Sequence, residues 1–329
     1  MLYYNAIFAG MKTMVFSLFF LCLISTCVMA QRKDSIVSME GRQVTLSPVV
    51  VRSGTNVPGF IKKVEEDTTF YKAFKNLRIL NYSSINDVRM FNKKGNVEAS
   101  LYSKTRQWAS RSCRVTNVME EKTTGPFYKA DGDYNYYTAE LYASLFFARD
   151  TICGQTNVIG DPMKSIKGKK GIERHKEQLK MLFFNPGKDI PGIPLMGDKV
   201  KVFDQSHADL YDFSIDINEY KGRPAYQFSL KMKDGLVFYK RDDVVIDEMT
   251  TWFDYESFEV KARNYKLSYN AGLYKFNVSM EVEIEKFGAY LYPKVIRYDG
   301  NWGVVMKGKE RGLFTATIYD LALASAVLE

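Results

Sequence analysis

Residues 277–285 spell NVSMEVEIE and alternate between apolar and polar side chains without a slip. The apolar side of this alternation consists of Val278, Met280, Val282 and Ile284. Because a period of two residues is typical of a β-strand with one buried face, the stretch predicts a half-buried strand. Its apolar side needs a cover, and three covers satisfy it: a helix of the same chain, a second sheet or an apolar ligand.

Most of the C-terminal half has the same character as this stretch. Strand-like runs follow one another at 200–203, 210–220, 224–232, 236–239, 243–250, 257–269, 273–287, 289–298, 302–307 and 312–319. Short turn sequences separate them, and Asp299-Gly300 is the strongest hairpin signal among these. Short connections favour pairing between neighbouring strands, and therefore an antiparallel meander. Helices and strands do not alternate here, which excludes a parallel doubly wound sheet.

The whole chain predicts an α+β fold that is mainly antiparallel β. We expect five parts: a signal peptide at 1–30, an N-terminal arm with an edge strand at 31–57, a mixed helix and strand region at 58–185, a Pro- and Gly-rich loop at 186–199, and the meander at 200–320. In the arm, the β-like run from Val44 to Val51 is interrupted by Pro48. The mixed region opens with a helix at 58–79, because its apolar residues recur at helical spacing. The meander and the mixed region are expected to share one sheet.

The start of the sequence predicts the compartment. Lys12 precedes an apolar run from Val15 to Ile24, and a small-residue cleavage site ends at Ala30, as in a secretory signal peptide. The alternative is lipidation at Cys27, which is disfavoured because Thr26 stands where Gly or Ala is expected. No second run of about twenty apolar residues follows, so no membrane-spanning helix is predicted in the mature chain. We expect an exported protein of the periplasm or the outer-membrane surface.

The sequence carries no catalytic signature. Nucleotide-binding Gly-rich loops, His-Glu-x-x-His, Cys-x-x-Cys and Gly-x-Ser-x-Gly are all missing from the 329 residues. The net charge of +8 is spread along the chain, which favours an ordinary solvated surface, with a preference for anionic surfaces as the alternative. An exported protein rarely meets nucleic acid. We therefore expect no enzyme, no cofactor, no metal and no nucleic-acid partner.

Two further features leave alternatives open. Cys113 and Cys153 are the cysteines beyond the signal peptide, and they form either one disulfide or two separate buried thiols. Residues 164–184 predict a basic helix, which has either an ordinary solvated face or a face that docks on an anionic membrane surface. The cations proposed for that face are Lys167, Lys169, Lys170, Arg174, Lys176 and Lys180.

Two segments of the meander resemble a recurring unit of bacterial envelope proteins. YKGRPAYQFSLKMKDG, residues 220–235, places Gly222 and Tyr226 on one strand, and DDVVIDEMTTWFDYESFEVKARNYKL, residues 242–267, follows with Ile246-Asp247 and a returning strand. The unit is similar to that of the LolA-like lipoprotein-carrier family. TLSPVVVRSG, residues 45–54, also resembles envelope proteins that follow a carboxypeptidase-regulatory-like module.

The LolA-like resemblance implies a half-barrel, in which a strongly curved antiparallel sheet wraps around one or more helices. It also implies a non-enzymatic envelope protein that binds a lipid or a lipidated protein, with acyl chains on the concave face. The residues expected to line that ligand are Phe228, Leu230, Val278, Met280, Val282, Ile284 and Trp302. The alternative is a solid core in a structural or protein-interaction module of the envelope. The ligand and the oligomeric state stay open.

Overall fold

The computed structural model describes residues 34–39, 41–110, 113–146, 151–160, 167–190, 196–271, 274–304 and 308–324. They belong to one unit, from Asp34 onward. The predicted signal peptide, including Cys27, lies outside the described residues. Among the residues that are described, no helix is long and apolar enough to cross a membrane.

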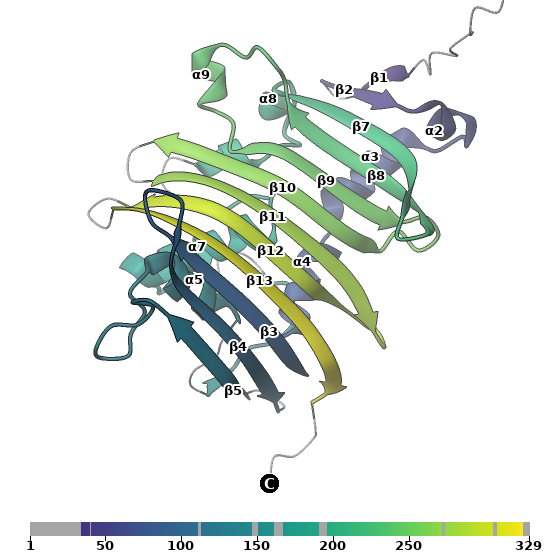
Figure 1. Cartoon of the computed structure of the whole chain (residues 1–329). Helices are drawn as coiled ribbons and strands as arrows, with labels where there is room; N and C mark the ends of the chain where they lie inside the picture. The colour runs from purple at the N-terminus through teal and green to yellow at the C-terminus, as the bar shows by residue number, and fades with distance from the viewer. Residues whose placement is uncertain are drawn as a thin grey trace, which may run out of the picture. The chain divides into compact units, whose positions relative to one another are not determined.

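One open sheet holds the described strands together (Figure 1). Its order is β1-β2-β7-β8-β9-β10-β11-β12-β13-β3-β4-β5-β6. The strands are β1 Ser35–Met39, β2 Arg42–Leu46, β3 Leu80–Phe91, β4 Val97–Ala109, β5 Cys113–Thr124, β6 Ile152–Cys153, β7 Tyr211–Tyr220, β8 Arg223–Met232, β9 Ile246–Asp254, β10 Val260–Ala271, β11 Tyr274–Phe287, β12 Tyr290–Val304 and β13 Gly308–Leu323. All neighbours pair antiparallel except β2 and β7, which are parallel. A disulfide joins Cys113 on β5 to Cys153 on β6.

Several of the helices cover one face of this sheet, which we call the inner face, and the sheet curves over them (Figure 1). The helices are α2 Pro48–Arg52, α3 Val57–Glu66, α4 Thr69–Asn76, α5 Tyr137–Phe146, α7 Gly171–Phe184, the short helix η1 Gly197–Val200, α8 Gln205–Ala208 and α9 Phe238–Arg241. The predicted α+β class with a curved, mainly antiparallel sheet is confirmed.

The helix predicted at 58–79 is two helices, α3 and α4. In α3 the buried residues Val57, Phe60, Ile61 and Val64 follow helical spacing, as predicted. The helix ends at Asp67, whose Oδ1 accepts hydrogen bonds from the backbone N–H and the hydroxyl of Thr69, at 3.0 and 2.6 Å. An aspartate that bonds the backbone two residues on favours a turn over a continuous helix, and periodicity alone does not reveal it.

The run from Val44 to Val51 is also two elements. The strand β2 ends at Leu46, and Ser47 then caps α2 with its side-chain oxygen, which accepts a hydrogen bond from Val50 N at 3.4 Å. Pro48 opens this helix, because a proline in the first turn gives up no hydrogen bond there. The strand of this run is not the edge strand: β2 lies between β1 and β7, and β1, also within 31–57, stands at the edge of the sheet.

The hairpin predicted at Asp299-Gly300 is wrong. Both residues lie inside β12, and Gly300 pairs with Val278 on one side and Gly312 on the other. The ring of Tyr298 lies over the glycine and leaves no space for a side chain there. A Cβ on Gly300 would lie 2.3 Å from the Tyr298 hydroxyl. The pairing of β12 with the strands on both of its sides outweighs the local preference of Asp299-Gly300 for a turn. The run at 236–239 is likewise no strand, because α9 begins at Phe238.

We expect Gly300→Ala to lower the free energy of unfolding by about 1–3 kcal/mol, as overpacking does in a core. Tyr298 has little freedom to yield, since its ring stacks on Phe314 at 4.4 Å and its hydroxyl accepts a hydrogen bond from Trp302 Nε1 at 2.6 Å. Urea denaturation measures the loss. Gly303→Ala in the same strand is the control, because its Cβ would meet atoms no closer than 3.6 Å. Equal stability of the two variants would contradict the explanation.

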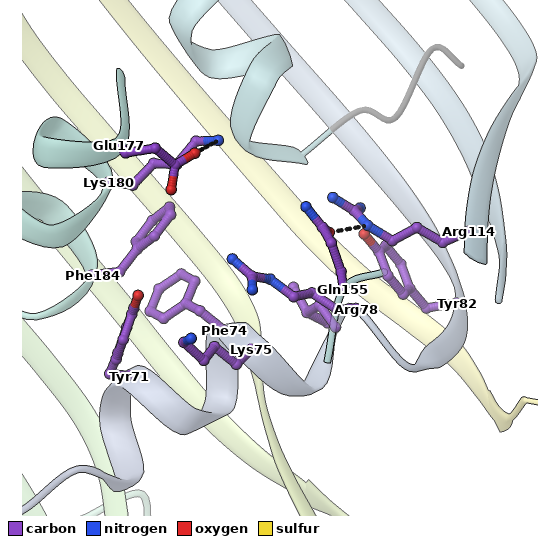
Figure 2. Close-up of a pocket in the computed structure, with 11 residues that line it drawn as sticks. Tyr71, Phe74, Lys75, Arg78, Tyr82, Arg114, Gln155, Glu177, Lys180 and Phe184 are labelled. Carbon is purple, nitrogen blue, oxygen red and sulfur yellow. Dashed lines mark hydrogen bonds and ion pairs between the residues drawn. The ribbon is translucent and has the colours of Figure 1, made fainter. Parts of the chain in front are cut away.

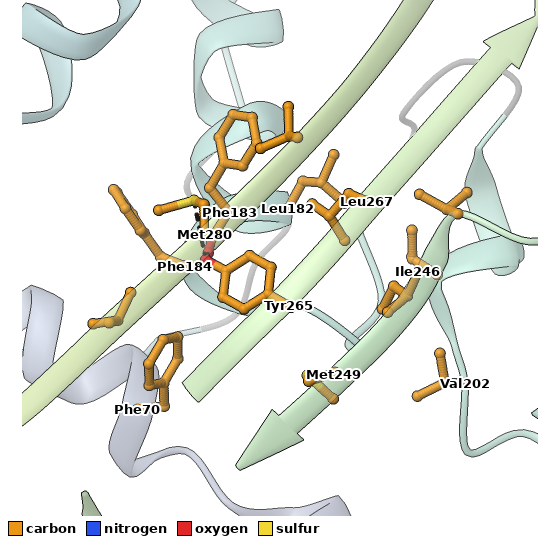
Figure 3. Packing of buried hydrophobic residues seen from close by; sticks show 14 of the residues in the cluster. Phe70, Leu182, Phe183, Phe184, Val202, Ile246, Met249, Tyr265, Leu267 and Met280 are labelled. Atoms are coloured by element: carbon orange, nitrogen blue, oxygen red, sulfur yellow. Dashed lines mark hydrogen bonds between the residues drawn. The ribbon is translucent and has the colours of Figure 1, made fainter. Parts of the chain in front are cut away.

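The inner side of β11 is covered by helices of the same chain (Figure 3). Tyr265 on β10 donates its hydroxyl to the carbonyl oxygen of Phe183 on α7, and the same hydroxyl lies 3.2 Å from Met280 Sδ. The ring of Phe70 on α4 meets Tyr265 edge-on, with centroids 6.5 Å apart. Of the three covers considered for residues 277–285, the structure has the helix.

Candidate functional site

The seven residues expected to line an acyl chain all lie in the hydrophobic core. Their exposed fractions run from 0 to 5%. Phe228 packs near Phe60 of α3, whereas Trp302 meets Phe183 of α7 with ring centroids 5.8 Å apart. These residues face inward, as the alternation predicted, but the chain's own helices occupy the space in front of them. The open hollow expected from the resemblance is therefore not found in the described part of the inner face.

A small apolar pocket remains between α5, α7 and the strands β11 to β13. Its walls are Thr138, Leu141, Tyr142, Phe183, Phe184, Met280, Tyr298 and Phe314. The free space is about 10 Å³, which is roughly what one water molecule needs. A hydrocarbon tail enters only if α5 or α7 moves away from the sheet.

Beside this pocket lies a second depression, which we call the cationic cleft (Figure 2). Its lining residues come from α4, the turn after it, β3, β5, α7 and the segment after β6: Tyr71, Phe74, Lys75, Leu77, Arg78, Tyr82, Arg114, Gln155, Glu177, Lys180 and Phe184. The cleft has about 50 Å³ of free space, enough for several waters or a small anionic group. Lys75, Arg78, Arg114 and Lys180 supply four positive charges, against the single carboxylate of Glu177.

The cations of the cleft are partly removed from water. Burial, together with the positive charge of the nearby Arg78, lowers the pKa of Lys75 to about 8. Burial also lowers the pKa of Arg114 and of Lys180, the latter despite its ion pair with Glu177 at 3.1 Å. Positive groups whose charged form is disfavoured gain most from a bound anion, so the cleft is suited to a phosphate or a carboxylate.

The segment after the disulfide holds this cleft in shape. Gln155 accepts a hydrogen bond from Arg114 Nε at 3.0 Å, and the carbonyl of Val158 accepts one from Lys75 Nζ at 3.0 Å. Asn157 donates to the side chain of Asn76 at 2.8 Å. Because Cys153 anchors the start of this segment to β5, the disulfide connects the cleft to the sheet.

Phe184 lines both the cationic cleft and the apolar pocket. Its ring stacks on Phe74 of α4 with centroids 4.1 Å apart and an interplanar angle of 20°. The side chain therefore separates a charged depression from an apolar one at the end of α7. The two depressions together match the polarity of an amphiphile. The cationic cleft suits a charged head group, and the apolar pocket on the other side of Phe184 suits a hydrocarbon tail.

The cations of the basic segment fall into two groups, those exposed to solvent and those that lie close to a carboxylate. Lys167, Lys170 and Arg174 are exposed. Lys169 and Lys180 instead lie 3.1 Å from Glu177, so their charge is directed to that carboxylate. The side chain of Lys176 lies outside the described residues. Desolvation raises the pKa of Glu177, but these two lysines outweigh it and hold the pKa below its ordinary value.

Of the four cations of the cleft, Lys180 was predicted from the sequence as a membrane-facing lysine, whereas Lys75, Arg78 and Arg114 were not predicted. Lys72, Lys75 and Arg78 recur every three residues, which places them along one side of α4 and the turn after it. That spacing was the available signal, because the buried Phe70 and Ala73 lie on the opposite side of the helix. Arg114 and Gln155 gave no signal, since only the tertiary fold brings β5 and the segment after β6 to α4.

No family model and no curated protein matches this sequence. Among solved structures, the chain is similar to a LolA superfamily protein from Nitrosomonas europaea, with 8% identity over 78% of this chain and 93% of that one, at a TM-score of 0.27. It is also similar to a DUF1329 family protein from Desulfovibrio piger, with 9% identity over 79% and 96% and a TM-score of 0.25. A structure on lipid–protein interactions in lipovitellin matches with 6% identity over 77% of this chain and 26% of that one, at a TM-score of 0.28.

The name of the first of these structures coincides with the LolA-like resemblance of the C-terminal strands, but its TM-score of 0.27 supports no conclusion about this chain. The resemblance to proteins that follow a carboxypeptidase-regulatory-like module finds no support in them. TM-scores of 0.25–0.28 carry no argument about a ligand.

Proposed function

We propose that this chain is a non-enzymatic exported protein that binds an anionic amphiphile, either a lipid or the acyl chain of a lipidated protein. The charged group lies in the cationic cleft, and the hydrocarbon lies under α7 in an enlarged form of the apolar pocket. The observation that supports this most directly is the position of Phe184, whose ring borders both depressions.

Binding by this route depends on a movement of α7. Each methylene removed from water contributes about 0.8 kcal/mol, so a long acyl chain offsets the cost of separating the end of the helix from the sheet. The affinity is reduced by the fraction of molecules in which α7 has not moved. The ligand therefore selects a form of the protein in which the apolar pocket is open.

The disulfide supports the exported location. Disulfides persist in oxidising compartments and are rare in the cytosol, and Cys113 and Cys153 are bonded here. The exported protein meets lipids and lipidated proteins in the envelope, which fits the proposed ligand class.

The pH dependence of binding tests the role of the cleft. We expect the affinity for a water-soluble phosphatidylglycerol, whose phosphodiester stays ionised, to fall as the pH rises through about 8, the pKa of Lys75. The charged lysine is present below that pKa and is lost above it, so the affinity falls by up to about tenfold per pH unit. Isothermal titration calorimetry at pH values on both sides of the pKa measures the change.

Lys75→Met keeps most of the side-chain volume and removes the charge. This variant should bind more weakly and lose the pH step. Lys62→Met is the matched control, because the side chain of Lys62 is 74% exposed and lies on α3, away from the cleft. An affinity of the unaltered protein that stays flat across this range, or a pH step that survives in Lys75→Met, argues against the cleft as the anion site.

One observation favours a second function. The inner wall is filled, with the seven expected lining residues at 0–5% exposure, and a solid core of this kind suits a structural or protein-interaction module of the envelope. Such a protein binds neither phosphatidylglycerol nor any other amphiphile in the cleft.

A further inference from the structure

A short helix projects from one end of the sheet. The helix α9 precedes β9 and lies beyond the end of the sheet where β10 finishes (Figure 1). The apolar residues at its start are exposed to water: Phe238 is 83% exposed and Tyr239 69%, and Val237, just before the helix, is 50% exposed. Three adjacent apolar side chains at this exposure are unusual for a surface that meets water alone.

The helix is attached firmly despite its exposed tip. Arg241 donates from Nη2 to Asp247 Oδ1 at 2.8 Å and to the Ser268 hydroxyl at 2.7 Å, which connects the end of α9 to β9 and β10. Within the turn, the N–H groups of Lys240 and Arg241 donate to the carbonyl of Val237 at 2.9 and 3.1 Å. The aromatic residues therefore project from a rigid support.

A wide cleft, which we call the rim cleft, lies at the base of α9. It has a volume of about 610 Å³, within the range of small-molecule sites. Arg241 and Asp242 border it on the α9 side, and Lys275 and Lys309 border it from the ends of β11 and β13. The two depressions near α7 are lined by other residues, so the rim cleft is a separate feature.

The surface formed by the rim cleft and α9, which we call the rim, carries a positive charge once the ion pairs within it are left out. Lys199 lies 3.1 Å from Asp243, and Arg241 pairs with Asp247. Lys240, Lys275 and Lys309 have no ion pair with any of the described residues. Lys275 and Lys309 line the rim cleft and Lys240 lies on the adjacent helix α9, so three lysines stand against the carboxylate of Asp242 beside the exposed aromatic residues.

We propose that this rim docks on an anionic lipid bilayer. Phe238 and Tyr239 insert at the level of the headgroups, where aromatic side chains are favoured, and Lys240, Lys275 and Lys309 face lipid phosphates. Free cations beside exposed aromatics match a membrane surface, which combines negative charge with an apolar interior. The inference concerns a surface of the chain other than the ligand site and does not depend on it.

Sedimentation with vesicles tests the docking surface. The full exported chain is mixed with vesicles of phosphatidylglycerol and phosphatidylcholine, or of phosphatidylcholine alone. We expect binding to the anionic vesicles to weaken at least about tenfold in Phe238→Ser/Tyr239→Ser, because the apolar burial is lost. Lys275→Gln and Lys309→Gln should each weaken it about fivefold, and pure phosphatidylcholine should bind least.

Met119→Ser is the matched control. Met119 is 70% exposed but lies on β5, far along the sheet order from β9 and β10. The proposal is overturned if the unaltered protein ignores anionic vesicles, if the Phe238→Ser/Tyr239→Ser variant binds as well as the unaltered protein, or if Met119→Ser loses as much binding. Each variant also keeps its affinity for soluble phosphatidylglycerol in the cationic cleft, so failure of docking and failure of the proposed function are distinguished.

Discussion

Asp67→Ala is expected to lower the free energy of unfolding by about 3–5 kcal/mol, the loss that follows when one partner of a buried ion pair is removed. Asp67 Oδ2 lies 3.6 Å from Arg263 Nη2, and the two side chains are only 4% and 6% exposed. Arg263 also donates to the Thr251 hydroxyl at 2.9 Å and lies over the ring of Phe70. Without the carboxylate, a guanidinium stays buried between α4 and β10 with no opposite charge.

Chemical denaturation gives the free energy for this test, and Glu66→Ala is its control. Glu66 is the preceding residue, and its pair with Lys62 is exposed and 3.8 Å long, so its loss should change stability by about 0–1 kcal/mol. Asp67→Leu/Arg263→Met should recover much of the stability, because replacing both partners leaves no buried charge. A double variant that is less stable than Asp67→Ala would show that the ion pair is not the cause.

Cys113→Ser/Cys153→Ser is expected to lower the free energy of unfolding by about 2–4 kcal/mol. The disulfide closes a loop with a sequence separation of 40, and an unfolded chain without this closure gains conformational freedom. The strand β6 that carries Cys153 is two residues long, so without the disulfide the segment after it depends on the hydrogen bond between Gln155 and Arg114 for its attachment to β5. Gln155 and the carbonyl of Val158 should then leave Arg114 and Lys75 more often.

Reductant provides the control for the disulfide. It should lower the stability of the unaltered protein toward that of the double serine variant and leave the variant itself unchanged. If reductant does not change the stability of the unaltered protein, and if that protein is only as stable as the double serine variant, the disulfide does not stabilise the fold. Thermal and urea unfolding under both conditions provide the comparison.

The sequence predicted the strands well because each strand's alternation is local. Residues 277–285 lie in β11 with the expected face inward, since one buried face imposes a period of two on any sequence that fills it. The incorrect predictions occur where a tertiary contact determines the local structure and overrides the local sequence pattern. Gly300 continues a strand because Tyr298 covers it and two neighbours pair with it. Asp67 ends a helix because its carboxylate bonds Thr69 and meets Arg263.

The candidate site could be predicted only in part. The alternation shows that Met280 and Val282 face inward, but it does not show whether helices fill the space before them. The position of α7 depends on contacts such as that between Tyr265 and Phe183, which lie 82 residues apart in the chain. The cationic cleft likewise combines α4 with β5 and the segment after β6. A binding site made of such distant parts leaves no motif of fixed spacing in the sequence.

The most direct test of the amphiphile proposal is native mass spectrometry of the full chain purified from its own host. We predict that the protein carries one acyl-bearing anionic molecule per chain, which organic extraction releases, and that Lys75→Met carries much less while Lys62→Met carries as much. A chain at its bare mass, folded and with no lipid in the extract, would contradict the proposal and leave a solid scaffold as the function.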